Sequence, residues 1–178
     1  MDEVRKQMVD QKTREKEHYS VMEMFYNGCS FANCGELCKK MTLDNNSAFL
    51  SNPMIINYAF ACEVFLKTLL EAYQLPQCQS HKLNELFQKL PEKVQLDIES
   101  ELEKKVGALT DAWGYSLLEQ VSNAFVEWRY IYEKFPSQIS SAIINTGYLT
   151  SLCEVLRNKC CMSIFHKSYK NALYENLL

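Results

Sequence analysis

Ala59-Phe60-Ala61-Cys62-Glu63-Val64-Phe65-Leu66-Lys67-Thr68-Leu69-Leu70 is the stretch that indicates how this chain folds. It lies in the longest apolar run, residues 53–73, which polar side chains interrupt on one narrow stripe. Those side chains are Asn57, Glu63, Lys67, Glu71 and Gln74. A helix that is apolar around most of its circumference lies in a protein core, and the polar stripe argues against a membrane span. The run therefore predicts the central helix of a bundle, with one polar seam.

Further helices are predicted on both sides of this central helix. They cover about residues 19–42, 81–90, 92–106, 110–136 and 143–165, and the central helix begins at Pro53 behind a Ser51 or Asn52 cap. Five glycines and four prolines leave few tight turns for an all-β fold. We therefore expect an all-α antiparallel bundle of five to six helices over residues 19–165. Residues 1–18 form a charged arm, and residues 166–178 form a tail that either extends the last helix or is loose.

The first helix is expected to bury Met22, Phe25, Tyr26, Cys29 and Leu37, because its large apolar side chains recur at helical spacing. Phe125-Val126-Glu127-Trp128-Arg129-Tyr130-Ile131-Tyr132-Glu133, in the helix over residues 110–136, places an arginine at the edge of an apolar stripe. The stripe consists of Leu118, Val121, Phe125, Trp128, Tyr132 and Phe135.

Arg129 lies roughly 40° from Phe125 on a helical wheel, and Glu133 follows one turn later on the same edge. Two interpretations remain open for Arg129. Either its stem covers the core while its head pairs with Glu133, or its guanidinium meets an acidic partner or an anion. Tyr132 falls on the core stripe, whereas Tyr130 faces away from it and is the better candidate for stacking on a base.

Ser80-His81-Lys82-Leu83-Asn84-Glu85-Leu86-Phe87 places a histidine at the start of a short helix. Ser80 is a suitable N-cap, and the buried side is expected to consist of Leu83, Leu86, Phe87 and Leu90. His81 then lies near a positive helix end, which favours the neutral imidazole. A lone histidine of this kind is more often structural than catalytic.

In this order, the segments 59–70, 80–87 and Trp128-Arg129-Tyr130-Ile131-Tyr132-Glu133 resemble the HEPN domains of prokaryotes, over roughly residues 19–165. The resemblance implies a small all-helical module that binds a nucleotide or RNA. It also implies a homodimer in which the arginines of two subunits face one another. Catalytic HEPN proteins are metal-independent RNases that use an arginine followed, after four to six residues, by a histidine.

This chain departs from that catalytic pattern. Lys134, Phe135 and Pro136 stand where the histidine would follow Arg129, and Met162 stands at the nearest such position after Arg157. Histidine is the side chain that exchanges protons near neutral pH. We therefore expect RNase activity to be weak or absent.

Two functions remain open. In the first, a nucleotide or RNA phosphate binds near Arg129, and the candidate ligand-binding residues are Arg129, Tyr130, Glu133, His81, Lys82 and Lys67. In the second, the chain is a non-catalytic dimerising partner or regulator in a defence or toxin–antitoxin system, with an interface formed by Tyr115, Val126 and Tyr130.

The composition narrows these alternatives. A net charge of −3 and a pI of about 5.7 argue against broad binding to nucleic-acid backbones, although a local anion site remains compatible with them. The eight cysteines do not resemble a disulfide framework, and the charged N-terminal segment does not resemble a signal peptide. We therefore expect a cytoplasmic protein with reduced thiols, no metal, no cofactor and no membrane partner.

Overall fold

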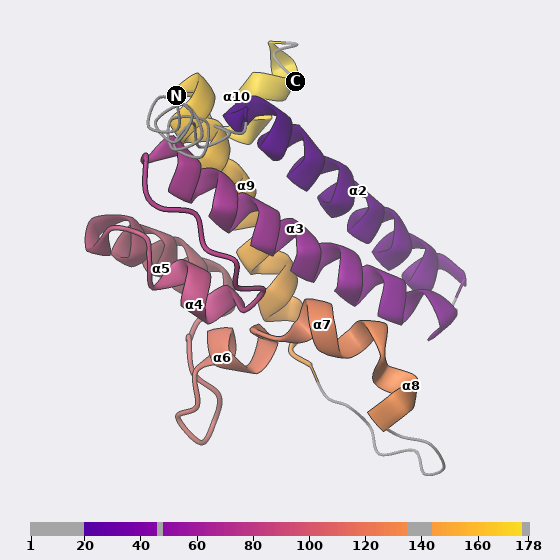
Figure 1. Ribbon diagram of the computed structural model, residues 1–178. Helices are drawn as coiled ribbons and strands as arrows, with labels where there is room; N and C mark the ends of the chain where they lie inside the picture. The colour runs from indigo at the N-terminus through magenta and orange to yellow at the C-terminus, as the bar shows by residue number, and fades with distance from the viewer. Residues whose placement is uncertain (1–19, 46–47, 135–143, 176–178) are drawn as a thin grey trace, which may run out of the picture.

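The computed structural model describes residues 20–45, 48–134 and 144–175, and these residues form helices joined by loops and turns (Figure 1). Within these ranges, the single extended pairing is an isolated bridge between Thr110 and Ser116. The predicted all-α fold is confirmed. The predicted charged arm, residues 1–18, lies outside the described residues.

Four long helices form the framework of the bundle. They are α2 (Val21–Asn45), α3 (Ser51–Ala72), α5 (Glu92–Val106) and α9 (Thr146–Phe165). A 3-10 turn, Ala48–Leu50, precedes α3, which runs antiparallel to α2 (Figure 1). The short helices are α4 (Leu83–Phe87), α6 (Leu117–Val121), α7 (Ala124–Arg129), α8 (Ile131–Lys134) and α10 (Tyr169–Tyr174).

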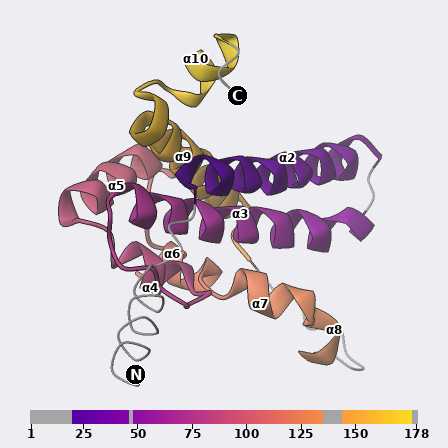
Figure 2. The ribbon, with the colours of Figure 1, turned by 45° about the horizontal axis from the view of Figure 1, so that its top comes forward.

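Helix α3 is the central helix, as the sequence predicted. It lies between α2 and α7, and α9 crosses it (Figure 2). Phe65, Leu66, Leu69 and Leu70 on α3 are completely buried. By length and composition alone, α3 could also cross a membrane, a property that it shares with core helices of soluble proteins, and most of it is buried among the other helices.

Helix α2 approaches α3 through small residues. A Cβ atom on Gly28 would lie 2.6 Å from Cε1 of Phe65, and one on Gly35 would lie 3.0 Å from Cγ of Tyr58. Ala32, between these glycines, is also completely buried. The absence of side chains at Gly28 and Gly35 therefore allows the aromatic rings of α3 to lie directly against the backbone of α2.

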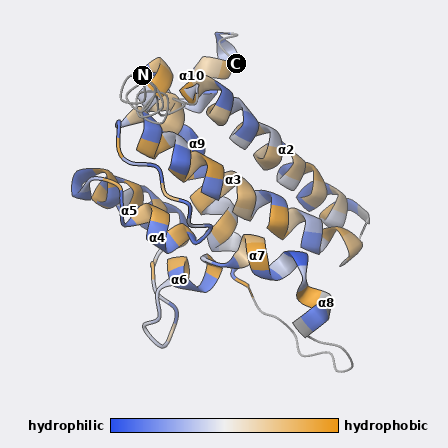
Figure 3. Cartoon of the chain, viewed as in Figure 1, coloured by the Kyte–Doolittle hydropathy of each residue, from blue (hydrophilic) through white to orange (hydrophobic). Residues whose placement is uncertain are grey.

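The inward face predicted for α2 is wrong for three of its five residues. Phe25 is buried and Cys29 is partly buried, whereas Met22, Tyr26 and Leu37 are exposed. The prediction selected large apolar side chains, but the face that contacts α3 contains the small residues, because a close helix contact needs little volume. Figure 3 shows how apolar and polar residues alternate along the helices.

The single helix predicted over residues 110–136 is also wrong. Residues 107–116 form a loop in which Oδ1 of Asp111 accepts hydrogen bonds from the backbone N–H groups of Trp113 and Tyr115, each at 2.9 Å. Three short helices, α6, α7 and α8, then follow. The loop contains Gly114 at φ 83°, and Ser116 caps α6 by accepting from the N–H of Glu119. Asp, Gly and Ser form turns and caps readily, so the local chemistry overrides the apolar periodicity.

Other predicted helix boundaries are closer to those observed. Helix α5 spans residues 92–106 as predicted and ends at Gly107, whose φ of 81° few other residues adopt readily. The residue at the N-cap of α3 is Leu50 rather than Ser51 or Asn52, because the 3-10 turn leads directly into the helix. Residues 166–175 of the C-terminal tail do not extend α9, which ends before the left-handed His166, and they contain the separate helix α10 with Ala172 buried.

Candidate functional site

A buried carboxylate lies at the centre of the polar seam of α3. Glu63 is 2% exposed, and its Oε1 atom accepts a hydrogen bond from Nζ of Lys67 at 2.7 Å. Nδ1 of His81 lies 2.9 Å from the same oxygen, while the buried Oε2 atom has no hydrogen-bond partner. Burying a charge is costly unless it is paired, so Lys67 and His81 are the groups that stabilise Glu63 in the core.

The loop between α3 and α4 brings His81 to Glu63. Nε2 of Gln77 donates to the backbone oxygen of Lys67 at 3.2 Å and to Oε2 of Glu71 at 2.7 Å, which attaches the loop to α3. At the start of α4, the N–H of Leu83 donates to the backbone oxygen of Ser122 at 3.1 Å. These bonds fix His81 between α3 and the segment that leads into α7.

Ser80 is not the N-cap predicted for this helix. The N-cap is Lys82, and the Ser80 hydroxyl accepts from the N–H of Lys82 at 3.0 Å and donates to Oε2 of Glu85 at 2.7 Å. The hydrogen bond from Ser80 has the largest effect on the pKa of the Glu85 carboxyl and lowers it. The hydrogen bond from Lys82 has the next largest effect and acts in the same direction. Lys82 itself forms an ion pair with Glu85 at 2.9 Å, so its charge is already partly compensated.

A column of aromatic rings supports Arg129. Phe31 contacts Phe60 edge-to-face, and Phe60 stacks on Phe125, in both cases with ring centroids 4.5 Å apart. Cζ of Arg129 lies 4.2 Å from the centroid of Phe125 and 5.5 Å from that of Tyr130. The guanidinium thus continues a column that contains rings from α2, α3 and α7, and cation–π attraction favours this position.

The predicted pairing of Arg129 with Glu133 is wrong. Helix α7 ends at Arg129, and Tyr130 adopts φ −121° and ψ 29°, so Glu133 belongs to the separate helix α8. The four-residue spacing therefore does not place the two side chains on one helical edge. Within residues 20–45, 48–134 and 144–175, no carboxylate lies within ion-pairing distance of Arg129, which is exposed.

Three of the predicted ligand-binding residues are linked through Glu63 and Phe125: Lys67 and His81 contact Glu63, and Arg129 contacts Phe125. His81 also lies near Phe125, with ring centroids 6.3 Å apart. We call Glu63, Lys67, His81, Phe125 and Arg129 the Glu63 cluster. Tyr130 lies at its edge, and Lys82 is adjacent to it in sequence.

Glu63 and Phe125 are the members of this cluster that the sequence did not indicate as site residues. In the sequence, Glu63 was a residue of the polar stripe of α3 and part of the segment 59–70 that resembles HEPN domains. The spacing of Glu63 and Lys67 was visible in the sequence, but this spacing is common on helices. A carboxylate at the middle of a largely apolar helix was the signal that could have identified Glu63.

The predicted interface residues do not lie on one helix. Val126 lies within α7, and Tyr130 follows its last residue; both are partly exposed. Tyr115 belongs to the loop before α6. The loop replaces the first part of the predicted long helix. The apolar side expected for that helix is therefore reduced to Val126 and Tyr130.

His81 and Arg129 are the members of the Glu63 cluster whose N–H groups can donate hydrogen bonds to an anion. Because the carboxylate oxygen of Glu63 accepts, Nδ1 of His81 donates to it. Nε2 is the remaining ring nitrogen of this side chain, which is 57% exposed. Arg129 presents planar N–H groups that suit a phosphate or carboxylate. Comparisons of this chain with protein-family models, with curated proteins and with solved structures found no match.

Proposed function

We propose that this chain binds a phosphate group of a nucleotide or of RNA at the Glu63 cluster. The observation that carries the proposal is the state of Arg129. Its guanidinium is stacked on Phe125 and lacks a carboxylate partner within the described part of the chain. A phosphate that contacts Arg129 gains charge-assisted hydrogen bonds without first breaking an internal ion pair.

His81 supports the same ligand from a different element of the fold. Glu63 orients the imidazole through Nδ1, so that Nε2 can approach a phosphate oxygen when the ring is protonated. Lys67 neutralises Glu63, which reduces the repulsion between the buried carboxylate and an incoming anion. The acidic net charge of the chain favours a local site of this kind over a broad basic surface.

Tyr130 is the residue on which a nucleobase of the proposed ligand would stack. Its side chain is partly exposed next to Arg129, and an aromatic ring beside a phosphate site suits stacking on a nucleobase. The resemblance to HEPN domains agrees with this ligand class. The proposed function is therefore binding of nucleotide or RNA, without cleavage.

The test is a binding titration of a short fluorescent RNA and of a mononucleotide at low ionic strength. Arg129→Lys should weaken binding by about 1–3 kcal/mol, because lysine cannot reproduce the planar two-point contact. Lys89→Gln, which changes an exposed charge on the loop that follows α4, serves as the control and should retain the wild-type affinity apart from a small salt-sensitive loss. Equal affinities of the wild type and Arg129→Lys would refute the proposal.

The same RNA should remain intact during prolonged incubation without metal. The arginine and histidine of the Glu63 cluster come from different elements, so the absent sequence motif does not by itself settle the question of cleavage. Cleavage that disappears in His81→Gln and in Arg129→Lys would contradict the binding-only function and would assign proton transfer to His81.

An association function is the second candidate, and exposed apolar residues around α7 favour it. Val126 and Tyr130 are both partly exposed, and apolar surface of this kind is commonly covered by a partner. The expected partner is a second copy of this chain. Sedimentation at tens of micromolar should then give a dimer that Val126→Asp disrupts, whereas a 20.7 kDa species would contradict it.

A further inference from the structure

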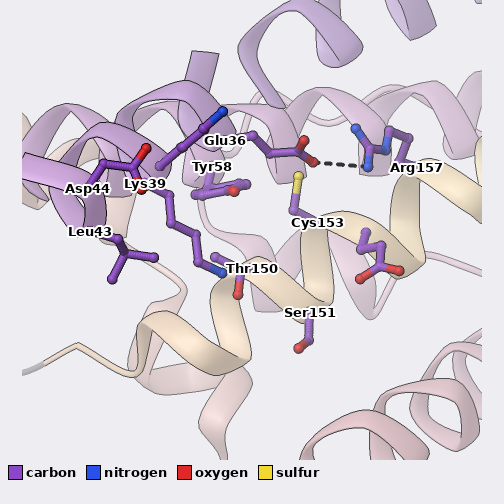
Figure 4. A pocket seen from close by; sticks show the side chains of 11 residues that line it. Glu36, Lys39, Leu43, Asp44, Tyr58, Thr150, Ser151, Cys153 and Arg157 are labelled. Atoms are coloured by element: carbon purple, nitrogen blue, oxygen red, sulfur yellow. Dashed lines mark hydrogen bonds and ion pairs between the residues drawn. The ribbon is translucent and has the colours of Figure 1, made fainter. Parts of the chain in front are cut away.

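A second charged region lies between α2 and α9, where the structure contains a cleft of about 450 Å³. Its lining includes no member of the Glu63 cluster. The cleft falls within the range of volumes found for small-molecule sites. Figure 4 shows the side chains around it, with Glu36 extending from α2 toward Arg157 on α9.

Arg157 is an unusual residue for this position, because it is 9% exposed and lies among the buried residues of α9. Its Nη2 atom donates to Oε1 of Glu36 at 3.1 Å, and its Nη1 atom lies 3.5 Å from Oδ1 of Asn33. The ring of Tyr169 lies 4.2 Å from the guanidinium carbon. The Nε atom is buried and has no hydrogen-bond partner, so the charged group retains an unused donor.

The charges around the cleft leave an excess of cations. Glu154 is paired with Lys105 at 2.9 Å, and Glu36 is paired with Arg157. Lys39 and Lys40 also line the cleft, and neither forms an ion pair with a described residue. Asp44 is the remaining carboxylate in the lining, so the positive charges exceed the negative ones once the internal pairs are counted.

We propose that this cleft binds a small molecule through a phosphate or carboxylate group, which Arg157 holds together with Lys39 and Lys40. When no ligand is present, Glu36 forms an ion pair with the guanidinium of Arg157. The site is separate from the one in the proposed function and does not depend on it. We call it the Arg157 cleft.

The geometry of arginine explains why Glu36 acts as an internal competitor. A carboxylate or phosphate contacts a guanidinium best through two parallel N–H bonds, whereas Glu36 is within bonding distance of Nη2 and leaves Nε unpaired. The Glu36 side chain is 53% exposed, so it can turn toward water when a ligand arrives. A ligand oxygen on Nε and another on Nη2 would complete the hydrogen bonding of Arg157.

The proposal predicts a variant that gains affinity. Glu36→Gln removes the competing negative charge, so inorganic phosphate or acetate should bind this variant about tenfold more tightly than the wild type. Lys39→Gln combined with Lys40→Gln should weaken binding by about the same factor. A misfolded variant can lose affinity for the anion but cannot gain it. The affinity gain expected for Glu36→Gln therefore supports the proposal even if the double lysine variant misfolds.

Binding is measured by calorimetry with phosphate and, separately, with acetate, at constant ionic strength. Lys104→Gln changes an exposed charge on α5 outside the cleft lining and is the matched control. Arg129→Lys separates this site from the Glu63 cluster and should leave the affinity gain of Glu36→Gln intact. The anion that shows the gain identifies the ligand group, and the absence of a gain with both anions would overturn the proposal.

Discussion

Glu63 and Arg157 are two buried charges of opposite sign, and the protein stabilises them in different ways. Both Lys67 and His81 approach the same oxygen of Glu63. Arg157 has one carboxylate, one amide and one aromatic ring around it. Each group also retains one buried atom without a partner, Oε2 of Glu63 and Nε of Arg157.

The partners of these two charges differ in their distance along the chain. Lys67 lies one helical turn from Glu63, and His81 lies 18 positions away. Glu36 and Asn33 lie 121 and 124 positions from Arg157. The anion is therefore stabilised mainly within one supersecondary unit, whereas the cation depends on the docking of α9 against α2. This difference predicts how each region responds to substitution.

The largest predicted effect concerns the thiol of Cys29 beside Arg157. Burial raises the pKa of Cys29 from 9.0 to about 12, although the positive charge of Arg157 acts in the opposite direction. The thiolate fraction below pH 9 is then about a thousandfold smaller than for an unperturbed thiol. Alkylation at pH 8 followed by mass spectrometry should label the exposed Cys34 long before Cys29. Equal rates would contradict the burial of the Cys29 thiol against α9.

Lys67→Met should have the next largest effect. It removes the strongest partner of a buried carboxylate, and losing one member of a buried pair costs about 3 kcal/mol of unfolding free energy. Urea unfolding measures this loss. The double variant Glu63→Leu with Lys67→Met should recover part of it, because the buried charge is then absent. A double variant less stable than Lys67→Met would contradict this account of the Glu63 cluster.

Glu36→Gln should cost less, at most about 1 kcal/mol of unfolding free energy, because the pair that it breaks has an exposed carboxylate. Asn33 and Tyr169 continue to contact Arg157 in this variant. The same urea experiment provides the comparison with Lys67→Met. If the two variants lost equal stability, the contrast between the local and the long-range ion pair would be wrong.

Arg129→Lys should have the smallest effect on stability, below about 0.5 kcal/mol. Arg129 is exposed, and a lysine can keep a cation over the ring of Phe125. Unfolding midpoints and RNA affinities measured on the same preparation separate a binding role from a structural one. A large loss of stability would indicate that the guanidinium is part of the core.

Particular residues show how far the sequence could predict the site. Arg129, His81 and Lys67 were chosen from their local patterns. The structure places His81 and Lys67 against Glu63, and Arg129 on the ring of Phe125, which lies near His81. The pairing of Arg129 with Glu133 failed because Tyr130 leaves the helical conformation and separates α7 from α8. From the sequence, Arg157 was a candidate only for the arginine–histidine motif. Its neighbours in the sequence do not indicate that it pairs with Glu36 or that it lines a cleft.

The sequence by itself determined the all-α class, the central position of α3 and the limits of α5, because apolar periodicity and helix-ending residues act over a few positions. The tertiary structure alone decided which face of α2 is buried, where His81 meets Glu63 and how Arg157 meets Glu36. These features depend on how closely helices approach one another. That distance is set by residues such as Gly28 and Gly35 and by the rings opposite them, which lie far away in the sequence.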